Sequence, residues 1–174
     1  MTMILTTRPE PSEAAPYYFG YIDLIPEGDI CETLASQRAS AMVLLRSISD
    51  ERSLYRYAPD KWSIREILGH LNDTERLFVS RAFWFARGFD TPLPSFDQHV
   101  AVRHAESDAR SWSSHLEEFE VVRAATLAFF RGLPAAAWVR RGIASDNLFT
   151  VRALAFLAAG HVTHHLNVLN KRYL

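Results

Sequence analysis

Apolar residues recur every three or four positions in four long stretches of the chain, a period that predicts α-helices. The four predicted helices cover residues 29–49, 63–87, 111–132 and 150–173, and a shorter helix is expected within 96–105. Because no convincing sheet accompanies them, the pattern favours an all-α protein built as a four-helix bundle. The connections between the long helices are long enough to allow a crossed topology as easily as simple up-down-up-down.

Polar residues at the predicted helix ends support these boundaries. Asp29 is placed to cap the first helix, with Glu32 three residues later as its capping-box partner. Ser63 and Glu66 form the same motif at the start of the second helix, which Gly88 is placed to end.

The segments outside the four helices are less regular. Residues 1–28 contain four prolines, which discourage regular structure, but also a run of tyrosines and aliphatic residues. We therefore expect an irregular N-terminal arm that packs on the bundle, with 29–174 forming a single four-helix-bundle domain. Residues 138–143 and 147–149 could pair as short extended segments, an alternative that the pattern leaves open.

Composition narrows the class of protein. At 174 residues, with 48% hydrophobic residues, the chain can bury a core large enough to stabilise the fold without a disulfide or a structural metal. Lys and Arg total 19 against 20 Asp and Glu, so no strong field favours nucleic acid. No apolar run reaches the length of a membrane span, and the first residues do not resemble a signal peptide. With one cysteine, Cys31, the expected location is the cytoplasm.

Three histidines lie within five residues of the last predicted helix. His161 and His165 are four residues apart on its core-facing row, so their side chains stack about 6 Å apart along the axis. A lone core histidine usually needs only one hydrogen bond, but two adjacent buried imidazoles leave several polar nitrogens to satisfy. A shared metal ion would satisfy them. His164 points about 60° away from His161 and is expected to flank the site.

A metal centre with an open position usually takes three protein ligands. His70 is the best third ligand because it lies on another long helix, at the edge of its buried side, and Gly69 leaves room for close approach. The remaining histidines lie on segments that we expect to be more exposed: His99, His104 and His115.

At these residues the sequence resembles the DinB/YfiT-like superfamily of four-helix-bundle proteins. The resemblance rests on Gly69-His70-Leu71-Asn72-Asp73-Thr74-Glu75-Arg76 and Gly160-His161-Val162-Thr163-His164-His165. Residues 56–64 before the second helix and 171–174 at the C-terminus also look like that family. The likeness spans residues 15–174. One departure is Leu166-Asn167-Val168, where relatives often have Arg-Gly-Gln.

The resemblance implies that His70, His161 and His165 hold one divalent metal, commonly zinc or nickel. Family members with known activities include S-transferases that use bacillithiol or mycothiol and a mycothiol-dependent maleylpyruvate isomerase. The implied partner is therefore a small molecule, with a low-molecular-weight thiol as co-substrate. No nucleic-acid or membrane partner is expected. Bundles of this size often pair through a helix face, so a homodimer stays open.

Three neutral imidazoles leave the full charge on a divalent ion, which can then lower the pKa of a thiol or of water. The ligands alone cannot choose between transfer or isomerisation and hydrolysis. Position 162 is valine, which excludes a protease of the His-Glu-x-x-His kind. Candidate bases are Asp73 and Glu66, one turn either side of His70, and the flanking His164. Glu66 could instead serve only its capping box, and Asp73 could pair with a neighbouring arginine.

Two other interpretations compete with a metal-dependent enzyme. The metal could be structural, in a non-catalytic protein, which a fourth protein ligand would favour. A regulatory or DNA-damage role is the weaker alternative, because the chain has no basic patch. Cys31 is not expected to act as a nucleophile, since no histidine base is placed beside it.

Overall fold

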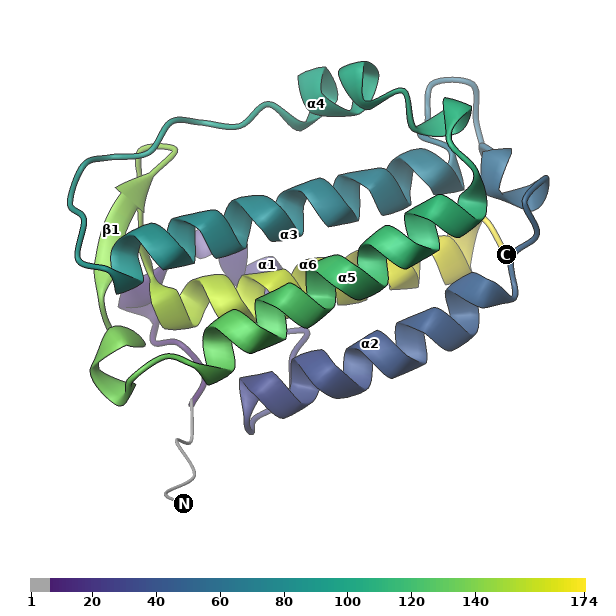
Figure 1. Cartoon of the computed structure of the whole chain (residues 1–174). Coiled ribbons are helices and arrows are strands. Elements are labelled where there is room, and N and C mark those ends of the chain that lie inside the picture. Colours follow the sequence, from purple (N-terminus) through teal and green to yellow (C-terminus); the bar gives the residue numbers. More distant parts are fainter. Residues whose placement is uncertain (1–6) are drawn as a thin grey trace.

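The computed structural model describes residues 7–174 and confirms the predicted all-α four-helix bundle (Figure 1). The four long helices match the predicted stretches: α2 (Ile30–Arg46), α3 (Ile64–Ala86), α5 (Trp112–Arg131) and α6 (Val151–Arg172). The short elements are α1 (Phe19–Ile22), α4 (Gln98–Ala105), β1 (Arg141–Ala144) and β2 (Asn147–Thr150). Within the described residues no helix is long and apolar enough to cross a membrane.

The bundle has a crossed topology. Helix α2 packs on α5 and α6, and α3 packs on the same two helices, so α2 and α3 lie diagonally opposite although they are consecutive in the chain. Helices α3 and α5 run in the same direction, and the segment 87–111, which joins the end of α3 to the start of α5, runs back along the outside of α3 and includes α4 (Figure 1). This long return places α4 over the outer side of α3.

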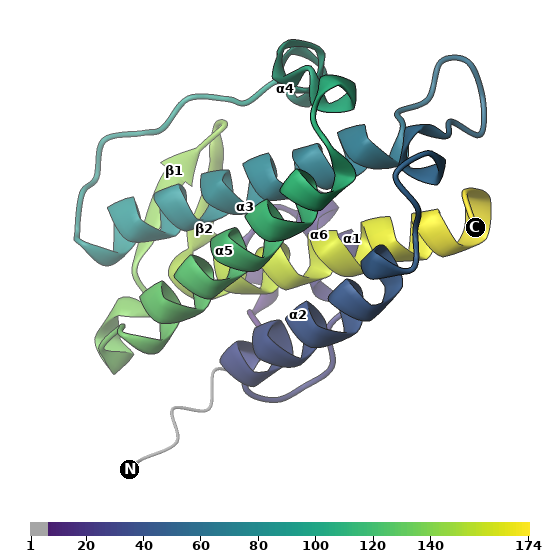
Figure 2. The ribbon, with the colours of Figure 1, turned by 45° about the vertical axis from the view of Figure 1, so that its right-hand side comes forward.

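Helix α6 is the central helix of the fold. Its first half is buried on every side, because α3 and α2 cover one part of it and α1 covers the opposite part (Figure 2). A β-carbon at Gly160 would lie 2.2 Å from the carbonyl oxygen of Tyr21, so only glycine lets α1 approach this closely. The one-sided apolar row expected for this helix was therefore incomplete, since the arm supplies a second covering layer.

The N-terminal arm is more regular than its prolines predict. Single turns of 3-10 helix at Pro11–Glu13 and Pro16–Tyr18 lead into α1. Ile22 and Ile25 are buried in the main core, so this part of the arm packs against the bundle. Residues 1–6 of the predicted arm lie outside the described residues.

The helix ends follow the predicted signals with one exception. Ser63 and Glu66 form a complete capping box, and Gly88 ends α3 with a φ of 84° that favours glycine. Asp29 accepts hydrogen bonds from two backbone N–H groups of α2. Glu32 is not its capping-box partner, because the Glu32 carboxylate is drawn to Arg131 of α5 at 3.0 Å.

The extended pairing left open for the region before the last helix is present as a hairpin. Strands β1 and β2 pair antiparallel through a two-residue turn, in which Ser145 and Asp146 have φ values of 50° and 59°. Such a turn normally takes glycine or asparagine. Leu93 of the returning segment holds it from outside: its N–H donates to Ile143 at 2.9 Å and its carbonyl accepts from the N–H of Ser145 at 3.1 Å.

Candidate metal centre

Three histidines from two helices converge in the middle of the bundle. The Nε2 atom of His161 lies 3.1 Å from Nε2 of His70 and 3.2 Å from Nε2 of His165. Ligand nitrogens of all three rings lie within 4.8 Å of one another. His70 and His161 are buried and His165 is half-buried. The structure thus brings together the three histidines that the sequence singled out; that they bind a metal stays a prediction.

The spacing and the chemistry of these nitrogens fit a metal ion. Ligands 2.0–2.1 Å from a tetrahedral zinc ion lie about 3.3 Å from each other, close to the separations around His161. The Nδ1 atoms of His70 and His165 have no hydrogen-bond partner among the described residues. Nδ1 of the buried His115 is also unpaired in the described chain, but its Nε2 atom bonds to the backbone carbonyl of Ser107 at 2.9 Å, as in an ordinary core histidine, whereas the Nε2 atoms of the cluster face one another. The cluster is not held by such bonds.

Thr74, one turn after His70 on α3, fixes the tautomer of His161. The Thr74 hydroxyl donates its one proton to the backbone carbonyl of His70 at 2.7 Å. It therefore accepts from Nδ1 of His161, which lies 3.1 Å away. With the proton on Nδ1, the Nε2 lone pair of His161 is directed at the other two rings. This hydroxyl is the kind of outer partner that orients histidine ligands in metal sites.

Electrostatics keeps the cluster neutral. Burial lowers the pKa of His70 to about 4 and that of His165 to about 3, and holds the pKa of His161 well below its ordinary value. Each neighbouring imidazole adds to the effect, because two positive rings this close would repel. All three rings are therefore uncharged at neutral pH, each with one nitrogen lone pair free, which is the form that binds metals.

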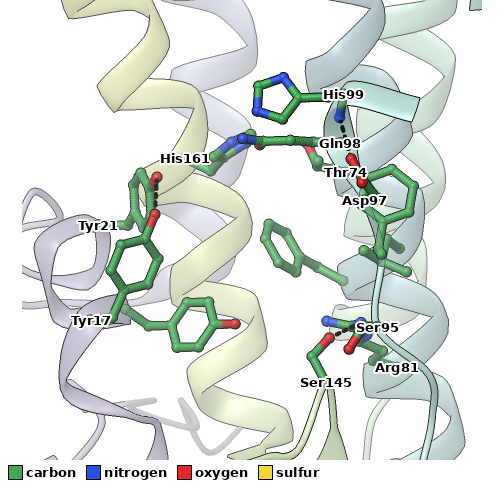
Figure 3. A pocket seen from close by; sticks show the side chains of 14 residues that line it. Tyr17, Tyr21, Thr74, Arg81, Ser95, Asp97, Gln98, His99, Ser145 and His161 are labelled. Atoms are coloured by element: carbon green, nitrogen blue, oxygen red, sulfur yellow. Dashed lines mark hydrogen bonds between the residues drawn. The ribbon is translucent and has the colours of Figure 1, made fainter. Parts of the chain in front are cut away.

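Two pockets reach the cluster from different sides. The tyrosine pocket has a volume of about 520 Å³ and is lined by Tyr17, Tyr18, Tyr21, Thr74, Phe78, Arg81, Asp97, His99, Ser145 and His161, among others (Figure 3). The tryptophan pocket, of about 340 Å³, is lined by Trp62, Tyr57, Tyr173, His99, His164 and His165, among others. No fourth histidine, cysteine, aspartate or glutamate of residues 7–174 joins the three-histidine group.

The other candidate residues lie outside the cluster or beside it. His164 packs edge-on against Tyr21 and His165 and lines the tryptophan pocket, so it flanks the site. Glu66 is engaged in its capping box and in an ion pair with Arg56. Asp73 faces Arg76 at 3.7 Å, and burial raises the pKa of its carboxyl group. Neither carboxylate lines the tyrosine or the tryptophan pocket.

The exposure expected for the remaining histidines was right for two and wrong for one. His99 and His104 are exposed, and His99 lines both pockets, with its ring 5.7 Å from that of Trp62. His115 is fully buried. A β-carbon at Gly69 would lie 2.5 Å from Oγ of Ser107, so this glycine admits Ser107, and with it His115, against the outer side of α3.

Several pocket residues were not singled out from the sequence. Thr74, Phe78 and Arg81 follow His70 at steps of four, four and three residues, which places them on one face of α3. Their spacing along the same helix face as His70 was the sequence feature that could have identified them as pocket residues. The tyrosines of the arm gave none, because their position over the cluster depends on how α1 folds back onto α6.

Comparison with solved structures supports the fold. YfiT from Bacillus subtilis, described as "a probable metal-dependent hydrolase with an unusual four-helix bundle topology", has a TM-score of 0.69 and 17% identity, over 94% of this chain and 89% of that chain. The mycothiol-dependent maleylpyruvate isomerase has a TM-score of 0.64 and 13% identity, over 83% of this chain and 60% of that one. No curated protein sequence matches the chain.

Comparison with protein-family models shows the family of the chain. The model of the DinB superfamily matches residues 33–169, which include the three clustered histidines and most of the bundle. The match agrees with the crossed arrangement of α2, α3, α5 and α6, and with the two structural neighbours. The chain belongs to the DinB superfamily.

Proposed function

We propose that this protein is a metal-dependent enzyme that activates a thiol or water for reaction with a small molecule. The observation that supports it best is the convergence of His70, His161 and His165, three neutral imidazoles with no fourth ligating residue beside them in the described chain. A divalent ion, zinc or nickel, would supply Lewis acidity that lowers the pKa of a thiol or a water molecule.

The protein residues around the cluster fit a reaction site better than a closed structural site. His161 and His165 each line a pocket, so the site can be approached from two sides. Thr74 orients His161, and burial keeps the three imidazoles uncharged. The exposed His99, shared by both pockets, is placed to accept or return a proton.

The two structural neighbours point to the classes of reaction to test. One is described as a probable metal-dependent hydrolase and the other as a mycothiol-dependent isomerase. We therefore propose hydrolysis or thiol-dependent transfer or isomerisation as the reaction, with a low-molecular-weight thiol as the co-substrate in the second case.

The test begins with the metal content of the purified chain. We expect close to one transition ion per chain by elemental analysis, and loss of that ion in His161→Ala with the helix content unchanged by circular dichroism. His104→Ala, the same change at an exposed position, is the matched control and should keep the ion. A wild-type chain that takes up no metal would overturn the proposal.

Turnover separates the catalytic from the structural interpretation. The metal-loaded chain is incubated with an activated ester and with an epoxide, each with and without cysteine as the thiol. Turnover lost in His161→Ala and kept in His104→Ala supports an enzyme. If His161→Ala instead loses its helices with its metal, and the wild type turns over neither compound, the ion is structural.

A further inference from the structure

One buried arginine has no acidic partner within the part of the chain that the structure describes. The described residues include three buried arginines: Arg65, Arg81 and Arg123. Arg65 pairs with Asp50 at 2.7 Å, and Arg123 pairs with Glu75 at 2.7 Å. Arg81 has no carboxylate within 4 Å among residues 7–174 and is only 4% exposed.

The hydrogen bonds of Arg81 leave its charge uncompensated. Its Nη2 atom donates to the carbonyl of Pro94 at 3.0 Å and to Oγ of Ser145 at 2.8 Å, both neutral acceptors. Its Nε atom has no partner in the described chain. A guanidinium group stays protonated even when burial lowers its pKa, as it does here. A buried cation is normally paired, so this group is arranged for an anion from outside the chain.

Arg81 lies in the wall of the tyrosine pocket, at a distance from the histidine cluster (Figure 3). Thr74, which contacts His161, is seven residues before Arg81 on α3, a rise of about 10 Å along the helix. Phe78 lies between them, with its ring 5.9 Å from that of His161.

The pocket therefore has a cationic end at Arg81, an apolar middle at Phe78 and, at its other end, His161 of the candidate metal centre. Ser145 at the cationic end is held in a left-handed conformation by the hairpin turn and by its hydrogen bond to Leu93. This fixes its hydroxyl beside the guanidinium. The tyrosines of the arm close the opposite wall, where the Tyr17 and Tyr21 hydroxyls lie 3.4 Å apart (Figure 3).

We propose that the tyrosine pocket binds a small molecule through one carboxylate, which Arg81 and Ser145 hold while the reactive end of the molecule lies at His161. This names the substrate class of the proposed function and rests on it for the reaction, although the binding itself requires no metal. A planar carboxylate matches the fork of N–H groups on a guanidinium.

The charges around the pocket favour a carboxylate over a dianionic phosphate. Arg81 is the one cationic side chain that lines the tyrosine pocket in the described structure. Asp97 lines the same pocket, and hydrogen bonds from the backbone N–H groups of α4 lower the pKa of its carboxyl group, so it stays ionised. A dianion would meet a single positive charge and a negative neighbour.

The test is a calorimetric titration of the full chain as purified with sodium benzoate and sodium hexanoate. Benzamide and hexanamide are the uncharged counterparts, and inorganic phosphate is the competing anion. We expect saturable binding of at least one carboxylate, with its amide and phosphate at least about tenfold weaker. Equal affinity for a carboxylate and its amide, tighter binding of phosphate, or no saturable binding of either carboxylate would overturn the proposal.

Two variants assign the binding to Arg81. Arg81→Met should weaken carboxylate binding at least about tenfold and leave amide binding unchanged. Arg87→Met removes the same charge from an exposed position at the end of α3 and should change neither. Unchanged carboxylate binding by Arg81→Met would contradict the assignment. A shift of the Arg81 Nε–H resonance on adding carboxylate to the wild-type chain checks it without a variant, and its absence counts against it.

A titration of the metal-free protein separates this inference from the proposed function. The titration is repeated after dialysis against a chelator, with folding checked by circular dichroism. Binding that persists and still depends on Arg81 supports the carboxylate site whether or not the histidines hold a metal. Binding that disappears with the metal would show that the carboxylate binds the ion, and would overturn the role of Arg81.

Discussion

Replacing Arg123 by methionine should destabilise the protein far more than the same replacement of Arg81. The side chains of Arg123 and Glu75 are 0% and 1% exposed. They form a two-pronged pair, with Nε to Oε1 at 2.8 Å and Nη2 to Oε2 at 2.7 Å. Arg123 also donates to Oε1 of Gln37 at 2.7 Å. Arg81 and Arg123 are thus similarly buried, but replacing Arg123 leaves a buried carboxylate without its partner, whereas replacing Arg81 does not.

The expected magnitudes follow from the group left unpaired. Arg123→Met leaves the Glu75 carboxylate buried without a counter-charge, which costs about 3–5 kcal/mol, a large share of the roughly 5–15 kcal/mol of a typical domain. Arg81→Met leaves no carboxylate unpaired. It loses two hydrogen bonds to neutral oxygens, about 0.5–1.5 kcal/mol each, and removes a desolvated charge. We expect a net change within about 1 kcal/mol.

Urea denaturation followed by circular dichroism measures both changes, provided that the slope against urea is the same in each variant. The double variant Arg123→Met with Glu75→Leu removes both charges and should recover most of the lost stability, since it leaves no buried ion. The reasoning is refuted if Arg123→Met loses no more stability than Arg81→Met, or if the double variant is as unstable as the single one.

Three further predictions concern the cluster and the arm. Thr74→Val removes the acceptor that orients His161 and should weaken metal binding by about 10–100-fold, measured by competition with a chelator. In metal-free protein, the pKa values of His70 and His165 are lowered to about 4 and about 3. As the pH falls, these histidines therefore bind protons in the unfolded chain, where their pKa is about 6.5, before they do so in the folded chain. The free energy of unfolding should then fall from pH 6.5 towards 4 by about 1.4 kcal/mol per pH unit for each histidine, and equal urea midpoints at pH 7 and 5 would contradict this. Gly160→Ala should displace α1 and lower the melting temperature by several degrees, roughly 2–4 °C per kcal/mol, and an unchanged melting temperature would show that α1 can shift freely.

The four helices could be predicted because their signals are local. A 3.6-residue period and a capping box at Ser63 and Glu66 are present within a few residues of sequence. The failures are non-local. Glu32 was predicted to complete a capping box, but Arg131, far along the chain, lies close enough to take its carboxylate. The first half of α6 is apolar almost all round, but that α1 of the arm is the element that covers its outer side cannot be seen within α6.

In the candidate site, too, the features that depend on local sequence could be predicted and those that depend on distant contacts could not. His161 and His165 share a face of one helix, so their spacing was enough to pair them. His70 was added by its place on another helix and by the family resemblance, and the structure brings it within 3.1 Å of His161. Arg81 escaped notice because an arginine in a helical pattern is usually solvated. Its significance is a missing acidic partner, which only the three-dimensional arrangement reveals.

The buried ion pair and the histidine cluster are linked through one polar network. Gln37 of α2, which accepts from Arg123, donates to the carbonyl of Ala159 and to the hydroxyl of Thr163, each at 2.8 Å. These two residues flank His161 on α6. Glu75, the acid of the pair, directly follows Thr74, which orients the same histidine.

This network ties α2, α3, α5 and α6 together at the level of the cluster, the place where an error of an ångström would separate the three nitrogens. Replacing a buried ion pair with apolar residues often leaves stability unchanged, so stability alone does not explain why this pair is buried here. Its position next to the cluster does, because hydrogen bonds fix the relative register of helices more narrowly than apolar packing. The double variant that recovers stability should therefore still bind metal more weakly than the wild type. Equal affinity would show that packing alone positions the histidines.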